Sequence, residues 1–312
     1  MDRRKRLVAP ILAASAFVLA FIAGCVAIRL LADQSVVTWL GRLPVWLTFV
    51  AMVAFWCLFA LIAWWLSERL FEEKDREVTH ENVARLLLVM TSFFVFVLGF
   101  VVAQEWSNLT SARNHVSQGA AAVYTAGYLA DPLPKKAAQD IKASLAELGQ
   151  SVTCDDLPAL RETGRGSPET AAALADTFKV ITDQPRPVRD EPTFGNIVDE
   201  VSAISEARSE WLAEAAAGLP TVLLATILIV SACLLAAFVV QSTRSRKGHL
   251  VTALGLALLV ALGTGLVISL SRPFGGAAQI PASTFQQGPY SVTNDCSKPP
   301  AIPELPSGAS SQ

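Results

Sequence analysis

Few residues in this chain have the types and spacing needed for catalysis. The three histidines, His80, His115 and His249, are far apart in the sequence, and no cluster of Cys and His has the spacing of a metal site. The sequence also lacks the glycine-rich phosphate loop, the GxSxG nucleophile turn and the HExxH zinc motif. We therefore expect no catalytic residues, no metal and no cofactor, and we predict that the protein is not an enzyme.

Three phenylalanines form a candidate pore neck. Phe93, Phe96 and Phe100 follow one another at spacings of three and four residues in one apolar stretch, so a helix would carry them on one face. Aromatic rings from several subunits can form a hydrophobic constriction that controls ion passage by dewetting. The alternative is that this face packs against lipid or a neighbouring helix.

The elements that position these residues are membrane helices. Of 312 residues, 52% are hydrophobic and 17% are charged, whereas soluble domains have roughly 25% charged residues. Five apolar segments reach the roughly 20 residues that cross a bilayer, namely 7–28, 43–66, 85–103, 220–240 and 250–271. Backbone polar groups must be satisfied inside the bilayer, so each segment should be helical. The expected fold class is an all-α polytopic membrane protein with five transmembrane helices.

Basic residues predict the orientation of these spans. Lys and Arg gather before the first span, between the second and third, and after the fourth. Cytoplasmic loops collect Lys and Arg, so we expect the N-terminus inside a bacterial cytoplasmic membrane and both residues 104–219 and the C-terminus outside. The net charge of −2 gives no reason to expect nucleic acid as a partner.

The predicted domains follow from this topology. Residues 1–42 form an extra N-terminal helix with a short loop, and residues 43–103 form two spans. Residues 104–219 form an extracytoplasmic helical bundle. Residues 220–272 form two further spans, and residues 273–312 form a partly disordered tail. Ile22-Ala23-Gly24-Cys25 also has the form of a bacterial lipoprotein cleavage box, which would leave a lipid on Cys25. The residues after Cys25 stay apolar, so we favour a retained helix.

The segment between spans three and four should be helical. Small and apolar residues recur at spacings of three and four from Leu109 to Ala130 without a break after span three, so one helix should continue as far as Pro132. Three further helices are expected: one with Ile141 and Leu145 on its buried face, one starting at Ser167-Pro168, and one over 197–215. The proline-rich residues 184–195 should form a loop. Acids outnumber bases in this bundle, which indicates either a solvated surface or a vestibule that concentrates cations.

Two of the five cysteines lie on the predicted outer side. These are Cys154 and Cys296, whereas Cys25, Cys57 and Cys233 lie in apolar spans. Disulfides persist in oxidising compartments, so we predict a Cys154–Cys296 bond that ties the tail to the bundle. Two unrelated thiols are the alternative.

Span five carries a stripe of small residues that favours close helix packing. Every fourth residue is small, at Ala253, Ala257, Ala261 and Gly265. No Asp, Glu or Lys lies deep in any span, which argues against an ion-coupled transporter.

Several stretches together resemble a family of uncharacterised bacterial integral membrane proteins called bestrophin-like, a domain of unknown function. The first stretch is His80-Glu81-Asn82, ahead of an apolar span that ends near Trp106, and the second is Ala112-Arg113 in a run of small residues up to Leu133-Pro134. The third is Ile204-Ser205-Glu206-Ala207-Arg208, followed by Gly218-Leu219-Pro220. The last is Arg272-Pro273-Phe274 after span five, with Ile280-Pro281 and Phe285 beyond it. The sequence departs from the family pattern at Ser271, where the family usually has Asp, and in its additional first helix.

The resemblance implies kinship with bestrophins, which are pentameric anion channels with an aromatic neck. Span three would then line the pore of a homo-oligomer in the lipid bilayer. The soluble part of a bestrophin is cytoplasmic, whereas the charge pattern here places it outside. We carry two hypotheses forward: an oligomeric ion (anion) channel, and a non-conducting cell-envelope scaffold or sensor whose outer bundle binds a protein partner.

Overall fold

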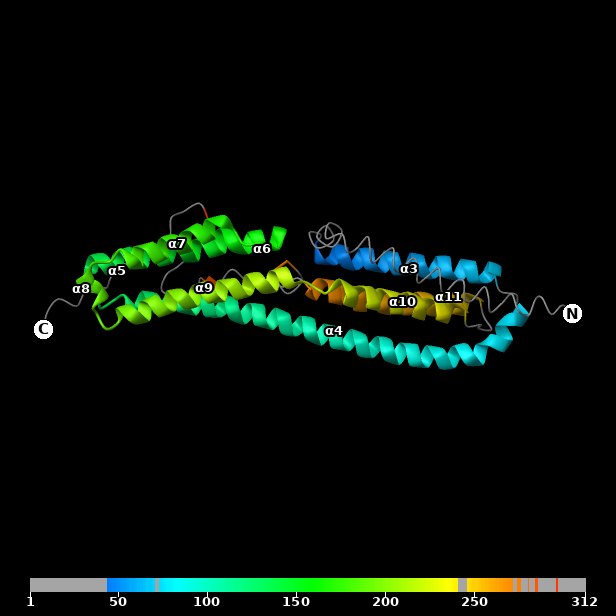
Figure 1. Cartoon of the computed structure of the whole chain (residues 1–312). Helices are drawn as coiled ribbons and strands as arrows, with labels where there is room; N and C mark the ends of the chain where they lie inside the picture. Colours follow the sequence, from blue (N-terminus) through cyan, green and yellow to red (C-terminus); the bar gives the residue numbers. More distant parts are fainter. Residues whose placement is uncertain are drawn as a thin grey trace. The chain divides into compact units, whose positions relative to one another are not determined.

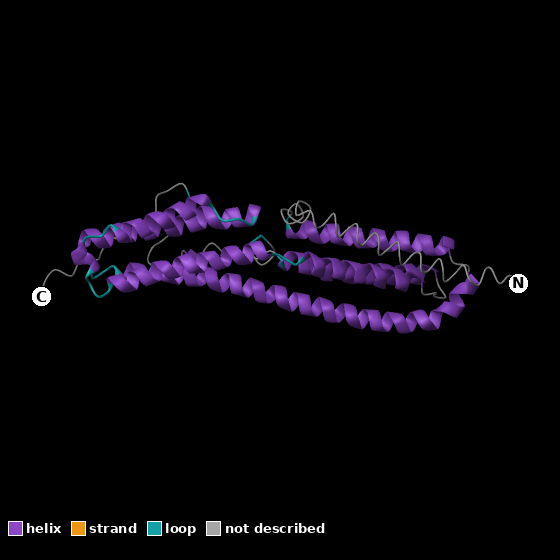
Figure 2. Cartoon of the chain, in the orientation of Figure 1, coloured by secondary structure: helices purple, strands orange, loops and turns teal. Residues whose placement is uncertain are grey.

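The computed structural model describes residues 44–70, 73–240, 246–271, 274–275, 280, 284–285 and 296. The longer elements are α-helices, and the described residues contain no strand (Figures 1 and 2). The chain divides into two compact units. The membrane unit contains Met1–Ser107 and Leu219–Arg272, and the polar unit contains Asn108–Gly218 and Pro273–Gln312. The predicted first span and Cys25 lie outside the described residues.

Within the residues that the structure describes, four helices contain stretches long and apolar enough to cross a membrane. They are α3 (Val45–Leu70), the first part of α4 (Glu73–Leu129), α10 (Thr221–Val240) and α11 (Arg246–Leu270). Four of the five predicted spans are therefore confirmed as helices, and the protein is an integral membrane protein.

The membrane unit has its own apolar core. α11 packs against α3 and α10, and its buried residues contact those of α3 and α4 around Trp56, Phe94 and Val101. The indole Nε1 of Trp56 donates a hydrogen bond of 3.0 Å to Oγ1 of Thr264, and both side chains are buried. A polar hydrogen in such surroundings is costly without an acceptor, so this bond helps to fix the register of α3 against α11.

The polar unit is built on the second part of α4. The helix runs without interruption to Leu129 and ends ahead of Pro132, as the unbroken seam of small residues predicts. The unit continues with six shorter helical elements: α5 (Lys135–Ser151), the π-helix η1 (Val152–Asp156), α6 (Leu157–Thr163), α7 (Pro168–Thr182), α8 (Arg186–Arg189) and α9 (Phe194–Ala217). Oγ of Ser167 accepts a hydrogen bond from the backbone N–H of Thr170, which confirms Ser167 as the N-cap of α7.

The prediction of a loop over 184–195 is wrong at both ends of that range. α8 forms at Arg186–Arg189, and α9 already begins at Phe194. Pro185 is the N-cap of α8 and Pro187 lies in its first turn, where a helix needs no backbone N–H from proline. Proline spacing alone was therefore a poor guide here. The short elements η1 and α6 also add to the four helices expected.

The chain after α11 contributes to the core of the polar unit. Phe274, Ile280 and Phe285 are buried among residues of α4, α5 and α9. Nη2 of Arg161, on α6, donates a hydrogen bond of 3.4 Å to the carbonyl oxygen of Ile280. At these three positions the chain after α11 is part of the core of the polar unit.

The structure joins Cys154 and Cys296 in a disulfide. The Cα atoms are 5.7 Å apart, and the two residues are separated by 142 positions in the sequence. Cys57 and Cys233 are free thiols in the membrane unit. The bond attaches the chain after α11 to η1, which contains Cys154.

We expect neither Cys154 nor Cys296 to react with a maleimide in the unfolded but unreduced protein, because their sulfurs are joined. Reduction before labelling should add two labels, at these two positions, as measured by peptide mass spectrometry. Cys154→Ser is the control, since it should leave Cys296 free to react without reduction. Labelling of both residues in unreduced protein would contradict the pairing.

Candidate functional site

The aromatic face of α4 is exposed in the single chain. Phe93, Phe96 and Phe100 have relative exposures of 51%, 72% and 59%. Each lies in the membrane unit, on one face of α4 because of its three- and four-residue spacing. Large apolar side chains exposed to this degree inside a membrane helix must face lipid or another protein surface.

The opposite side of the same helix is committed to the core. Leu87, Phe94 and Val101, spaced by seven residues, are buried against α3, α10 and α11 residues of the membrane unit. The helix therefore has one face packed inside the chain and a broad exposed apolar surface that contains the three phenylalanines, together with Leu88, Val89 and Val95. This division leaves the rings of Phe93, Phe96 and Phe100 available for contacts outside the chain.

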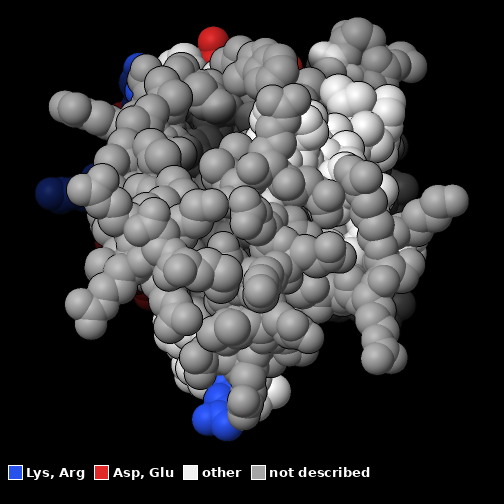
Figure 3. Space-filling view, turned by 90° about the vertical axis from the view of Figure 1, so that its right-hand side faces the viewer, with Lys and Arg blue, Asp and Glu red and all other residues white. Residues whose placement is uncertain are grey.

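Among the described atoms visible in Figure 3, uncharged side chains lie beside a few Lys and Arg and a few Asp and Glu side chains at the periphery. Glu105 lies on α4, two residues beyond the predicted end of span three, and its acidic side chain is buried.

The stripe of small residues on α11 lies in the interface with the neighbouring helices. Ala253, Ala257, Ala261 and Gly265 are all buried. A Cβ atom on Gly265 would lie 2.9 Å from Cδ1 of Phe49, on α3. The missing side chain thus lets α11 approach α3 closely, which is a packing role and brings no reactive group to the stripe.

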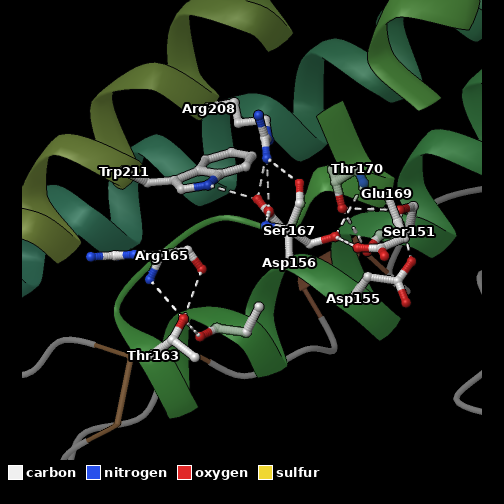
Figure 4. Close-up of polar contacts among 11 residues, drawn as sticks. Ser151, Asp155, Asp156, Thr163, Arg165, Ser167, Glu169, Thr170, Arg208 and Trp211 are labelled. Atoms are coloured by element: carbon white, nitrogen blue, oxygen red, sulfur yellow. Dashed lines mark hydrogen bonds and ion pairs between the residues drawn. The ribbon is translucent and has the colours of Figure 1, made fainter. Parts of the chain in front are cut away.

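The polar unit contains a buried carboxylate with four hydrogen bonds. Asp156, at the end of η1, is fully buried. It accepts hydrogen bonds from Nε and Nη2 of Arg208 (3.2 and 2.9 Å), from the backbone N–H of Ser167 (2.7 Å) and from Nε1 of Trp211 (3.3 Å). Figure 4 shows Arg208 and Trp211 reaching Asp156 from α9. We call Asp156, Ser167, Arg208 and Trp211 the Asp156 cluster.

The Asp156 cluster ties three parts of the polar unit together. Asp156 comes from η1, Ser167 precedes α7, and Arg208 and Trp211 lie one turn apart on α9. Nη2 of Arg208 also donates to the carbonyl oxygen of Ser167 at 3.1 Å. Buried charges are stable only when paired and hydrogen-bonded, and here both requirements are met. Both carboxylate oxygens of Asp156 are engaged by these donors, which is the arrangement of a buried ion pair that holds the fold.

Sequence reasoning missed Asp156. The available signal was Arg208, which closes one of the stretches that resemble the bestrophin-like family, but nothing local pairs it with an acid 52 residues away. Next to the cluster, Oγ of Ser167 donates a hydrogen bond of 2.6 Å to Glu169. This hydrogen bond lowers the pKa of Glu169, which keeps a negative charge at the N-terminal turn of α7.

The motif after span five is only partly described. Phe274 lies in the core of the polar unit, whereas Arg272 and Pro273 lie outside the described residues. The structure therefore supports a packing role for the aromatic residue of the motif. Ser271, which stands where the family usually has Asp, donates a hydrogen bond to the carbonyl oxygen of Ile268.

Fold and site together define a helical integral membrane protein that carries a polar helical unit between two pairs of spans. The family model of the Bestrophin-like domain matches residues 54–285. The chain therefore belongs to the bestrophin-like family, which confirms the resemblance seen in the sequence. A search of the curated proteins finds no match.

Solved structures of a bacterial Bestrophin homolog from Klebsiella pneumoniae share this fold. The structure solved by Zn-SAD phasing is 14% identical, with a TM-score of 0.58 over 76% of this chain and 93% of that chain. One variant is 14% identical, with a TM-score of 0.60 over 78% and 94%. Another is 13% identical, with a TM-score of 0.58 over 76% and 94%. At such low identity the likeness establishes the fold alone.

Proposed function

We propose that the protein is an oligomeric ion channel of the bestrophin-like family, in which Phe93, Phe96 and Phe100 form the hydrophobic neck. The observation that carries the proposal is the exposed aromatic face of α4 on a helix whose other side is buried in its own chain. A face of this kind is suited to meet the same face of other copies around an axis. Family membership and the shared fold support the same reading.

The neck would act by excluding water. A ring of phenylalanine side chains offers no hydrogen-bond partner, so water leaves a narrow constriction and ions cannot pass until it widens. A single chain supplies one aromatic face and cannot enclose a pore by itself. The proposal therefore requires a homo-oligomer, and we take the symmetric ring as part of it.

We place the polar unit on the outer side of a bacterial cytoplasmic membrane. The Lys and Arg residues between spans two and three and after span four support this orientation. The disulfide between Cys154 and Cys296 supports it independently, because disulfides persist in oxidising compartments and are rare in the cytosol.

Replacing Phe96 with alanine should increase ion flux several-fold, because a smaller side chain widens the neck and admits water. The measurement is halide and potassium flux from liposomes that contain the purified protein. Val95→Ala is the matched control: Val95 is also exposed, but it points about 100° away around the helix. Comparing the two ions also reports whether the channel prefers anions.

Two results would contradict the channel. The first is the absence of flux in both wild type and Phe96→Ala, with the protein shown to be inserted and folded. The second is a monomer both in mild detergent and after cross-linking in native membranes, since one chain supplies only one face of the neck.

A non-conducting scaffold or sensor is the second candidate, and one surface feature favours it. A groove of about 770 Å³ lies between α5 and α7 of the polar unit. Charged side chains of both signs line it, among them Lys136, Asp140, Asp176 and Lys179, over a floor that includes Val180. Such a surface suits a polar protein segment. Copurification of one stoichiometric partner, lost when Asp140 and Asp176 are both replaced by lysine, would support this function.

A further inference from the structure

A histidine lies between two carboxylates in the polar unit. His115 is on α4, and Glu210 and Glu214 are one turn apart on α9. Nδ1 of His115 lies 2.5 Å from Oε2 of Glu210, and Nε2 lies 3.5 Å from Oε1 of Glu214. The carboxylates approach opposite nitrogens of the ring, so they cannot converge on one metal ion. The arrangement is suited to binding protons.

Both contacts are favourable only when the three side chains share two protons. A neutral imidazole has one N–H donor and one acceptor nitrogen, so with a single proton one nitrogen lone pair faces a carboxylate and repels it. A second proton on the ring gives an imidazolium with two donors. A second proton on Glu214 gives a neutral acid that donates to Nε2. Either arrangement places a proton between each ring nitrogen and its carboxylate and removes this repulsion.

The surroundings of Glu214 favour keeping the second proton. Burial raises the pKa of Glu214; the nearby His115 opposes this rise, and the negative charge of Glu210 adds to it. Oε2 of Glu214 is buried and has no hydrogen-bond partner in the part of the chain that the structure describes. An ionised oxygen in that position is costly, since it has lost water without gaining a donor.

The other charged groups of the neighbouring elements are engaged or turned away. Arg208, on α9, is held by Asp156, and Arg161, on α6, donates to the carbonyl of Ile280. Glu206, one turn before Glu210 on α9, is exposed. Arg113, two residues before His115 on α4, has its Cα about 160° around the helix from that of His115.

We propose that His115, Glu210 and Glu214 form a proton-controlled latch between α4 and α9. The latch is closed while it binds two protons and opens when it loses one. Because the closed form binds more protons than the open form, raising the pH of the surrounding compartment shifts the equilibrium towards the open form. The latch does not depend on ion conduction.

Hydrogen–deuterium exchange of the full-length protein in lipid nanodiscs tests the latch. Exchange in wild type and in His115→Gln is compared at pH 5.5 and again at pH 8.5. Because each comparison is made at a single pH, the intrinsic pH dependence of exchange cancels. At pH 5.5 we expect peptides from 108–122 and 204–217 to exchange several-fold more slowly in wild type than in His115→Gln, because the closed latch holds α4 against α9. At pH 8.5 the ratio should approach one. Glu214→Gln should also remove the pH dependence, but by keeping the protection at both pH values, because its neutral amide N–H can donate to Nε2 of His115 without a bound proton.

Glu206→Gln is the matched control, because it removes an exposed carboxylate one turn away and should keep the wild-type pH dependence. The latch is absent if wild type and His115→Gln differ equally at both pH values, or if Glu206→Gln loses the dependence as fully as His115→Gln. Flux measured on the same protein separates the two proposals. Protection that depends on pH in a protein without flux would support the latch and reject the channel.

Discussion

Replacing Arg208 with alanine should destabilise the polar unit by about 3–5 kcal/mol, the usual effect of removing one partner of a buried ion pair. Asp156 is fully buried, and two of its four hydrogen bonds come from the guanidinium of Arg208. Without that guanidinium, an uncompensated carboxylate remains inside the unit. Thermal unfolding followed by limited proteolysis should show cleavage within 108–218 at temperatures where the wild-type protein resists it.

Two further variants separate the charge from other effects of this substitution. Arg165→Ala removes an exposed arginine of the same unit and should change the unfolding temperature little. Combining Asp156→Asn with Arg208→Met removes both charges but keeps an acceptor oxygen for the backbone N–H of Ser167, so it should recover part of the lost stability. If Arg208→Ala alone resisted heat and proteolysis as well as wild type does, the stability of the polar unit would not depend on the pairing of Asp156 with Arg208.

Replacing Gly265 with valine should weaken the membrane unit by about 3 kcal/mol, at the upper end of the range for overpacking. A Cβ atom at this position would lie 2.9 Å from Cδ1 and 3.0 Å from Cε1 of the Phe49 ring. Valine adds two more methyl groups, so α11 must move away from α3. Cys57 on α3 packs partly buried against the core of the membrane unit, so its reaction with a maleimide on heating, followed at this position by peptide mass spectrometry, reports loosening of that core.

Gly255→Val on the same helix is the control for this measurement. A Cβ atom on Gly255 would meet no atom within 4 Å. Both substitutions place valine in α11 and carry the same change in helix propensity, so the difference between their melting temperatures isolates the contact with Phe49. Equal melting temperatures would mean that the small residue at 265 is not needed for packing.

Sequence reasoning succeeded where a local pattern determines the structure. The uninterrupted run of small residues after span three predicts the continuation of α4 to Leu129, because no proline or positive-φ glycine interrupts it. The face of Ile141 and Leu145 and the cap at Ser167 are equally local, and both are present. The three-four spacing of Phe93, Phe96 and Phe100 places them on one face, and the structure adds that this face is exposed.

Long-range pairing could not be predicted in the same way. Asp156 follows Asp155 in a stretch that reads like a solvated acidic surface, and its partners Arg208 and Trp211 come more than fifty positions later. The contact of His115 with Glu210 and Glu214 also depends on how α4 and α9 are turned towards each other, which spacing along one helix does not specify. The role of Phe274 was hidden for the same reason, because the motif shows aromatic character but not which core it enters.

The burial of Phe274, Ile280 and Phe285 in the polar unit has a consequence for the order of assembly during synthesis. Helices α4 to α9 are made first, but the core that they enclose lacks these three side chains until α10 and α11 have also been made. At a synthesis rate of about 5–20 residues per second, that interval lasts several seconds. During it, the polar unit is incomplete and part of its apolar interior is uncovered. Insertion of the last two membrane helices is therefore a step on which the folding of the polar unit depends.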